Sequence, residues 1–196
     1  MQKNTKTIKN DLRTQYKVKR ALYSVDEKAL LDEKISSKIL NLTTYRNAET
    51  VLCYVSTTDE INTHFLIEQM IANGKKVAVP RCIPDTHEME FYYISSLSDL
   101  SKGAFSILEP LPEKSKLFCK DSSVICLIPA LSFDIYGYRL GYGKGYYDRF
   151  LSGFDGVKLG LSYYENITQA LPHGRFDCRV DSIVTECRIV VTKPEN

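Results

Sequence analysis

The chain has 196 residues, of which 26 are Lys or Arg and 24 are Asp or Glu. The formal net charge of +2 is small, whereas many proteins that bind nucleic acids or membrane surfaces are strongly basic. The overall charge therefore gives no support to either kind of partner. No apolar run approaches the roughly 18 residues of a membrane-spanning helix. The length favours one compact domain over residues 1–196 with a sizeable core.

The cysteines and histidines indicate neither a disulfide framework nor a transition-metal site. There is no C-x-x-C pair, no H-E-x-x-H motif and no secretory leader, so we expect free thiols and a cytoplasmic protein. Cys53 and Cys126 fall inside predicted strands, where a thiol packs as a small apolar side chain. The six cysteines are Cys53, Cys82, Cys119, Cys126, Cys178 and Cys187.

The first half of the chain predicts two helices followed by a crossover between parallel strands. Apolar residues at helical spacing predict a helix over 7–23, and Ser24 with Glu27 forms a capping box that opens a second helix. A strand, a helix ended by Gly74 and another strand then follow at the spacing of a βαβ unit, which implies parallel neighbours. These three elements are expected at residues 50–56, 63–73 and 76–80.

The second half predicts further strands around one glycine-rich segment. Residues 124–128 read as a buried strand that delivers the chain into this segment, whereas residues 103–120 read as irregular structure to which we assign no chemistry. The remaining expectations are strands at 89–94, 157–161, 183–185 and 189–192, a helix at 146–151 and a short helix at 165–171. We therefore predict an α/β fold, a single domain whose mostly parallel sheet is flanked by helices on both faces.

Residues 134–148, D-I-Y-G-Y-R-L-G-Y-G-K-G-Y-Y-D, hold four glycines, an Arg and a Lys. Exposed backbone N–H groups in such a loop favour anions, and Arg139 and Lys144 add cations, so a chain of phosphates is the expected ligand. The spacing fits neither a P-loop nor a Rossmann fingerprint. The alternative is a flexible turn whose two cations have other partners.

Three side chains near this loop have two interpretations each. The carboxylate oxygens of Asp148 are suitable ligands for Mg²⁺. Alternatively, the negative charge of Asp148 interacts favourably with the N-terminus of a helix. Tyr146 and Tyr147 offer aromatic faces that can cover a flat ligand, and core packing of at least one is the alternative.

The first predicted helix carries a pair of cations on one face. Lys9 and Arg13 stand at positions i and i+4, where their charges repel each other unless an anion lies between them. A solvated basic helix is one alternative, and non-specific nucleic-acid binding is the other.

Several of these segments together resemble one enzyme family. Residues 129–134 and 137–148 closely resemble the signature of the 5-formyltetrahydrofolate cyclo-ligase family, also called methenyltetrahydrofolate synthetase. Further matching pieces stand in family order at residues 9–13 (K-N-D-L-R), 54–56 (Y-V-S), 59–61 (D-E-I) and 183–186 (I-V-T-E). The resemblance therefore covers nearly the whole chain.

The resemblance implies a ligase of folate one-carbon metabolism with a cyclo-ligase-like fold. Such an enzyme converts 5-formyltetrahydrofolate to 5,10-methenyltetrahydrofolate, depends on ATP and Mg²⁺, and releases ADP and phosphate. The implied intermediate is a phosphorylated formyl group that N10 attacks. The implied partners are ATP and 5-formyltetrahydrofolate, with or without a polyglutamate tail, and we expect a monomer that binds neither nucleic acid nor membrane.

The resemblance also assigns roles residue by residue. Arg139 and Lys144 would be catalytic, and Asp148 and Asp181 would hold the metal. The ATP-binding positions would be Lys9, Asn10, Asp11, Leu12, Arg13, Arg139, Leu140, Gly141, Tyr142, Gly143, Lys144, Gly145, Tyr146 and Tyr147. The substrate-binding positions would be Val55, Glu60, Tyr142, Gly143, Lys144, Gly145 and Tyr146. Tyr142 departs from family members that carry Arg there.

Three other functions compete with this hypothesis. A different enzyme on a related fold, such as a sugar-phosphate isomerase or coenzyme A transferase relative, would not depend on ATP. A non-catalytic folate- or nucleotide-binding protein would bind without turnover. A nucleic-acid module acting through the first helix would show salt-sensitive binding.

Overall fold

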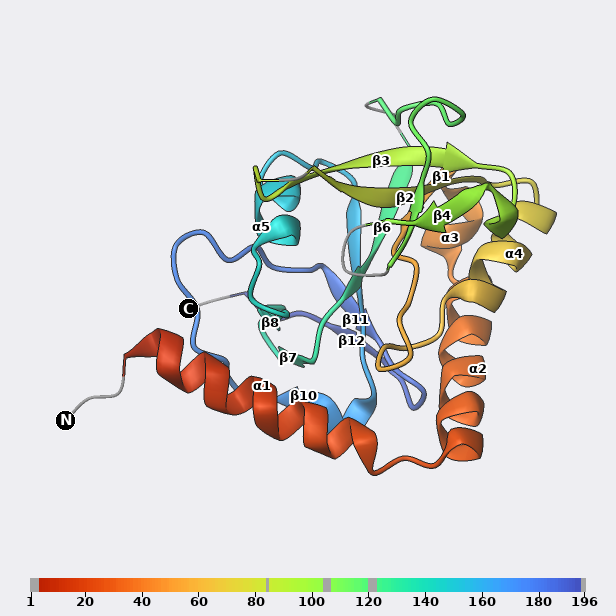
Figure 1. Ribbon diagram of the computed structural model, residues 1–196. Coiled ribbons are helices and arrows are strands. Elements are labelled where there is room, and N and C mark those ends of the chain that lie inside the picture. Colours follow the sequence, from red (N-terminus) through yellow and green to blue (C-terminus); the bar gives the residue numbers. More distant parts are fainter. Residues whose placement is uncertain (1–3, 84, 104–106, 120–122, 195–196) are drawn as a thin grey trace.

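The computed structural model describes residues 4–83, 85–103, 107–119 and 123–194. Within these residues the main sheet has seven strands in the order β12-β11-β9-β6-β1-β2-β3 (Figure 1). The strands are β1 (Thr50–Cys53), β2 (Lys76–Ile83), β3 (Glu88–Ile94), β6 (Val124–Pro129), β9 (Val157–Leu161), β11 (Ser182–Val184) and β12 (Ile189–Val191). The five central strands are parallel, and β3 and β12 are antiparallel edge strands. The predicted mostly parallel sheet is confirmed.

Helices cover both faces of this sheet, as predicted. The helices are α1 (Thr5–Ala21), α2 (Val25–Asn41), α3 (Thr43–Asn47), α4 (His64–Ala72) and α5 (Tyr146–Leu151). Successive strand residues point to opposite faces. Val51 therefore packs in one core cluster with side chains of α2, α3 and α4, whereas Leu52 packs in a second cluster with Leu151 of α5. Figure 1 shows α1 lying across one end of the molecule, beside β10 and away from the other helices.

The second helix and the first βαβ crossover form where their local sequence signals predict them. The Ser24–Glu27 capping box forms as predicted and starts α2, because each side chain accepts a hydrogen bond from the other residue's backbone N–H. Gly74 has φ +76° just beyond the end of α4, which is the left-handed conformation that glycine adopts most easily. β1, α4 and β2 form the predicted βαβ unit with parallel strands.

The structure corrects the expectation of a helix at residues 165–171. A short 3-10 helix, Tyr164–Asn166, is followed by strand β10 (Ile167–Thr168), which pairs with β7 (Ser132–Asp134). Two β-branched residues favour this pairing over a helix. Beyond them, the backbone N–H of Leu171 donates to a buried carboxylate oxygen of Asp134, which fixes a non-helical path.

Two further stretches are more regular than their sequences indicated. Residues 103–120 include β5 (Leu108–Pro110), which pairs with β4 (Leu100–Lys102) after a 3-10 helix at Leu97–Asp99. β2 continues through Pro80 to Ile83; its neighbour β1 pairs only as far as Ala78, so the missing proline N–H breaks no bond on that side.

A small sheet positions the glycine-rich segment. After β6 the chain turns through β7 and returns along β8 (Arg139–Leu140), with β10 on the other side of β7. The Asp134 carboxylate accepts hydrogen bonds from the backbone N–H groups of Tyr136 and Tyr138 within this turn. Gly137 has φ +94°, and a Cβ there would lie 2.5 Å from the Val180 carbonyl oxygen. Only glycine fits this turn, which delivers Arg139 and the following loop to the sheet edge.

None of the helices in the described ranges has the length and apolar character needed to cross a membrane.

Candidate active site

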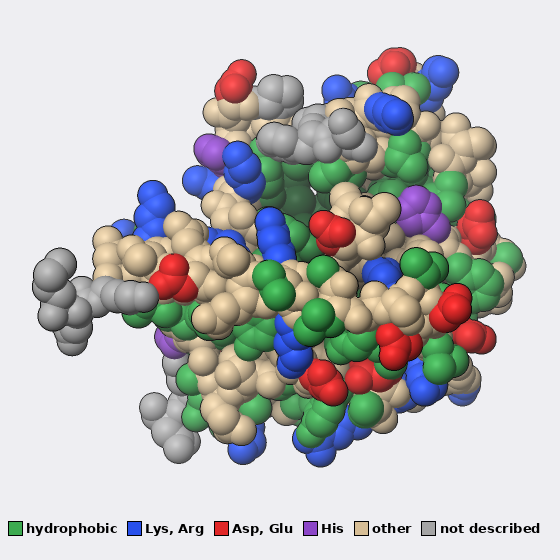
Figure 2. Space-filling view, turned by 60° about the horizontal axis from the view of Figure 1, so that its bottom comes forward, with side chains coloured by type: hydrophobic (Ala, Val, Ile, Leu, Met, Phe, Trp, Pro, Cys, Tyr) green, Lys and Arg blue, Asp and Glu red, His purple; other side chains and the backbone are tan. Residues whose placement is uncertain are grey.

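A cavity of about 400 Å³ opens at the carboxyl ends of parallel strands β1, β2 and β6, where ligands collect in open α/β sheets (Figure 2). Three segments far apart in the sequence meet in its wall: helix α1, the chain that follows β1, and the glycine-rich loop. All ten residues from Arg139 to Asp148 line the cavity. Its other lining residues are Lys9, Arg13, Tyr54, Val55, Thr57, Glu60, Pro80, Cys82, Met89, Ile107, Leu108, Glu109, Pro129 and Asp177.

Lys9 and Arg13 of α1 both reach the cavity and both are held by the protein. Lys9 forms an ion pair with Asp177, with an Nζ–Oδ2 distance of 2.8 Å. Arg13 donates from Nε to the Gly141 carbonyl oxygen at 2.8 Å and from Nη1 to Asn10 at 2.6 Å. These contacts contradict the alternative of a purely solvated basic face for this pair.

The three residues between these cations lie outside the cavity lining. Asn10 supports the Arg13 guanidinium through its side-chain oxygen. Leu12 packs against a small cluster formed by Leu131, Leu140 and Leu171, and Asp11 is exposed. Of the predicted ATP-binding positions on α1, the structure therefore brings Lys9 and Arg13 to the site.

The glycine loop lies directly against the α1 cations. Gly143 and Gly145 have φ of +96° and +77°, so both adopt a backbone conformation that other residues rarely take. A Cβ on Gly143 would lie 3.1 Å from Cζ of Arg13. The glycine at this position thus lets the guanidinium approach the loop backbone closely. Lys144 between these glycines is exposed at the cavity rim.

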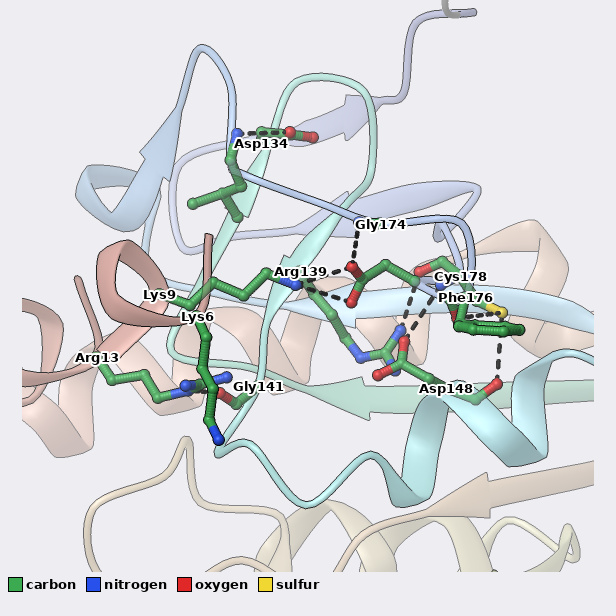
Figure 3. Close-up of polar contacts among 12 residues, drawn as sticks. Lys6, Lys9, Arg13, Asp134, Arg139, Gly141, Asp148, Gly174, Phe176 and Cys178 are labelled. Atoms are coloured by element: carbon green, nitrogen blue, oxygen red, sulfur yellow. Dashed lines mark hydrogen bonds and ion pairs between the residues drawn. The ribbon is translucent and has the colours of Figure 1, made fainter. Parts of the chain in front are cut away.

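Arg139 lies at the base of the loop and is buried (Figure 3). Its Nη2 donates to Asp148 Oδ1 at 2.6 Å, and its Nη1 donates to the Cys178 carbonyl oxygen at 2.9 Å. The Cys178 N–H donates to the same Asp148 oxygen at 3.2 Å. Asp148 therefore serves as an ion-pair partner in the cavity wall and is more than an acid at a helix start.

Asp177 is a cavity residue that the sequence did not reveal. Both its carboxylate oxygens accept hydrogen bonds from Lys9, and Oδ2 also accepts one from the Gly174 N–H at 2.6 Å. Burial raises its pKa, but these hydrogen bonds and the positive charges of Lys9 and Arg139 outweigh burial and hold the pKa below its ordinary value. Asp177 has no local motif; only the return of its loop onto α1 brings it to the site.

Asp181, the second predicted metal ligand, lies elsewhere. Its side chain is exposed, is not part of the cavity lining, and accepts a hydrogen bond from the Lys158 N–H at 2.7 Å. The structure brings together Asp148 and Asp177 at the cavity, and it does not bring Asp181 there. Within the described ranges, no group of three or more His, Cys, Asp or Glu side chains is arranged to hold a metal ion alone.

Val55 and Glu60, the predicted substrate contacts, line the cavity beside the loop. Glu60 is buried, and its Oε2 accepts hydrogen bonds from the Thr57 N–H at 2.9 Å and the Thr57 hydroxyl at 3.0 Å. Tyr142 of the glycine loop lines the same cavity close to Glu60. Partial burial, followed by the negative charge of Glu60, raises the pKa of the Tyr142 hydroxyl.

Part of the cavity wall comes from residues to which the sequence assigned no role. β5 contributes Leu108 and a buried Glu109, and β2 contributes Cys82, whose N–H donates to Glu109 Oε1 at 3.2 Å. Residues 107–109, within the stretch to which the sequence assigned no chemistry, therefore line part of the cavity. No motif marks these residues; the pairing of β4 with β5 brings them over the sheet edge.

The fold and the cavity define an α/β protein that combines a glycine-rich loop and four basic side chains at the carboxyl edge of a parallel sheet. A family model described as the 5-formyltetrahydrofolate cyclo-ligase family matches residues 5–186. The probable 5-formyltetrahydrofolate cyclo-ligase of Caenorhabditis elegans is 27% identical over 198 residues, covering 95% of this chain and 96% of its own. The chain therefore belongs to the 5-formyltetrahydrofolate cyclo-ligase family.

Solved structures agree with this assignment. The NMR structure of Aquifex aeolicus 5,10-methenyltetrahydrofolate synthetase superposes with a TM-score of 0.84 at 30% identity, covering 96% of this chain and 95% of that one. The 5,10-methenyltetrahydrofolate synthetase of Mycoplasma pneumoniae gives 0.72 at 29% identity, covering 91% and 98%. The predicted family, fold class and enzyme class, a ligase of folate one-carbon metabolism, are confirmed.

Proposed function

We propose that this enzyme converts 5-formyltetrahydrofolate to 5,10-methenyltetrahydrofolate in an ATP-dependent reaction that releases ADP and phosphate. One observation carries the proposal: the α1 cations, the glycine loop and the Val55–Glu60 segment, which the family resemblance links to two different substrates, line a single cavity. A reaction that joins a nucleotide to a folate needs both in one enclosed space.

The cavity lining combines two chemically distinct sets of side chains that suit the two substrates. Lys9, Arg13, Arg139 and Lys144, together with the glycine loop, would offer a triphosphate cations and backbone donors. The same cavity is lined by apolar side chains and by two buried carboxylates, Glu60 and Glu109. An apolar slot with acceptor oxygens suits the flat, N–H-bearing pterin ring.

The chemistry requires alignment and charge neutralisation more than a nucleophilic side chain. In the proposed sequence the formyl oxygen attacks the γ-phosphorus, ADP leaves, and N10 attacks the activated formyl carbon. N10 then loses its proton and the C–O bond breaks, so that phosphate departs and the five-membered ring is closed. Lys144 and Arg139 would offset the charge on the transferring phosphoryl group.

The residues present fit a magnesium ion that is carried largely by the nucleotide. Mg²⁺ at such sites takes one or two carboxylates together with phosphate oxygens and waters. Asp148 and Asp177 both line the cavity, so we propose these two, instead of Asp148 with Asp181, as the carboxylates near the ion. The ion would neutralise phosphate charge there, while Lys9 and Arg139 hold the two carboxylates in place.

The proposal is tested by mixing the purified protein with 5-formyltetrahydrofolate, Mg²⁺ and ATP and following the near-ultraviolet absorbance of the methenyl product. Absorbance that grows only with ATP supports the proposal. Absence of methenyl product from the folded protein would favour the isomerase- or transferase-like alternative, and binding of both ligands without turnover would favour a binding protein. A cytoplasmic location, a monomeric state and use of polyglutamylated substrates stay predictions.

A further inference from the structure

Arg20, in the last turn of α1, is a buried cation far along the helix from the two cavity cations. Arg20 is 8% exposed. Among the described residues, no carboxylate forms an ion pair with it. Removing a guanidinium from water costs on the order of several kcal/mol unless hydrogen bonds replace the lost hydration. The partners of Arg20 must therefore account for its burial.

Its hydrogen-bond partners are backbone carbonyl oxygens of two separate segments. Among the described residues Nε has no hydrogen-bond partner, and the guanidinium carbon lies 6.0 Å from the ring centroid of Tyr163. Nη1 donates to the Asp59 carbonyl at 3.3 Å. Nη2 donates to the carbonyl of Ala130, with a longer contact of 3.4 Å to that of Leu131. A planar guanidinium presents its donors in a rigid fork, so one side chain can hold carbonyls from two directions at once.

Both segments belong to the cavity wall. Asp59 directly precedes Glu60 in the turn that closes on Thr57, and Glu60 lines the cavity. Ala130 directly follows Pro129, another lining residue at the end of β6. Leu131 in turn donates its N–H to the Leu140 carbonyl oxygen, at the entrance to the glycine loop. One buried side chain thus joins α1 to the substrate segment and to the base of the loop.

The apolar contacts of α1 leave this role to polar groups. The cluster that packs α1 against the small sheet consists of Leu12 and Tyr16 with three leucines, whereas the two main cores contain no α1 residue among their described members. The position of α1 relative to the turn at residues 57–60 therefore depends on directional contacts. Among the hydrogen bonds of the described residues, the one from Arg20 to the Asp59 carbonyl joins α1 to this turn.

We propose that Arg20 is a positioning residue of the active site: its fork fixes the spacing between α1, which carries the nucleotide cations, and the Glu60 turn, which faces the folate. The inference rests on the proposed function for its catalytic consequence, and on the contacts alone for its structural consequence. A misplacement of about 1 Å between reacting groups can cost about a hundredfold in rate, so the spacing matters even though Arg20 does not line the cavity.

The test compares Arg20→Met with Lys19→Met. Lys19 is the neighbouring cation, and its Nζ donates to the Glu165 carbonyl oxygen, so its removal also weakens α1 docking without touching a cavity segment. We expect Arg20→Met to raise the KM for 5-formyltetrahydrofolate and lower kcat, each by about tenfold or more, while Lys19→Met stays within about twofold of the wild type. Equal kinetic constants in both variants below their melting temperatures would overturn the proposal.

A second measurement does not depend on turnover. Hydrogen exchange should accelerate at the amides of residues 57–62 in Arg20→Met and stay at the wild-type rate there in Lys19→Met. Unchanged exchange in Arg20→Met overturns the positioning role whether or not the enzyme makes product. If Arg20→Met does not fold, Arg20→Lys replaces it: the charge is kept but the fork is lost, and the same change in exchange and KM is expected at smaller amplitude.

Discussion

Arg139 and Asp148 are joined at 2.6 Å by an ion pair in which the arginine side chain is only 4% exposed and the aspartate side chain 28%. The same guanidinium holds the Cys178 carbonyl, and the same carboxylate accepts the Cys178 N–H. The glycine loop is therefore tied at its base to the loop that carries Asp177, and Arg139 has a structural role in addition to its proposed contact with phosphate.

This relationship changes what a substitution of Arg139 should do. Removing one partner of a buried pair leaves the other uncompensated and typically costs about 3 to 5 kcal/mol. Because Asp148 is partly exposed, we expect Arg139→Ala to lower the free energy of unfolding by about 2 to 3 kcal/mol, measured by urea denaturation, and to abolish turnover. A purely catalytic Arg139, as the family resemblance implies, would affect turnover with little effect on stability; an unchanged unfolding free energy would support that role alone.

Lys144 offers the cleaner test of charge in the loop, because its side chain is exposed at the cavity rim. We expect Lys144→Ala to reduce kcat by about a hundredfold, since a cation beside a transferring phosphoryl group acts mainly in the transition state. Its unfolding free energy should stay within about 0.5 kcal/mol of the wild type. Lys34→Ala, at an exposed position on α2, is the matched control and should leave both quantities unchanged. Wild-type turnover in Lys144→Ala would remove this residue from the catalytic assignment.

The proposed carboxylates predict a specific pattern of magnesium dependence. Asp148→Asn and Asp177→Asn should each raise the Mg²⁺ concentration needed for half-maximal turnover by about tenfold, because each removes a charged oxygen ligand from the cavity wall. Asp181→Asn should leave the titration unchanged, since its carboxylate is bound to a backbone N–H outside the cavity. The reverse pattern, with Asp181→Asn alone shifting the titration, would return the metal site to Asp181.

The Lys9–Asp177 pair predicts a pH-dependent contribution to stability. The folded-state pKa of Asp177 lies below its ordinary value of 3.8, so the unfolded chain binds the proton more tightly. The ionised carboxylate therefore stabilises the fold above about pH 4, and this contribution is lost as the pH falls through the folded-state pKa.

Asp177→Asn checks this dependence. At pH 7 the variant should be about 0.5 to 1 kcal/mol less stable than the wild type in urea unfolding, because the pair is partly exposed. The difference should shrink as both proteins are titrated toward pH 3. A difference that stays constant between pH 7 and pH 3 would show that the charge of Asp177 does not contribute.

Sequence reasoning located the parts of the site that carry their own local pattern. The glycine loop was readable because four glycines, an Arg and a Lys in one stretch have few structural explanations, and the capping box at Ser24 was readable because its two residues interact across one helical turn. The parallel crossover followed from element spacing alone. Each of these signals lies within about thirty residues of chain.

The missed residues depend on contacts between distant segments. Asp177 reaches the cavity through Lys9, which is 168 positions away, and Glu109 reaches it through the pairing of β4 with β5 over β2. The helix expected at 165–171 was wrong because β7 offers Ile167 and Thr168 a strand partner that no local pattern shows. Such outcomes follow from tertiary pairing, which overrides local propensity.

If one cavity couples ATP cleavage to ring closure, ADP release and formation of the methenyl product must depend on each other, and one reaction can record both. Purified wild-type protein with 5-formyltetrahydrofolate, Mg²⁺ and ATP should release one ADP for each methenyl product formed, and omission of either substrate should stop both signals. ADP release that continues without the folate, or methenyl product that forms without ATP, would show that the cavity does not couple the two reactions.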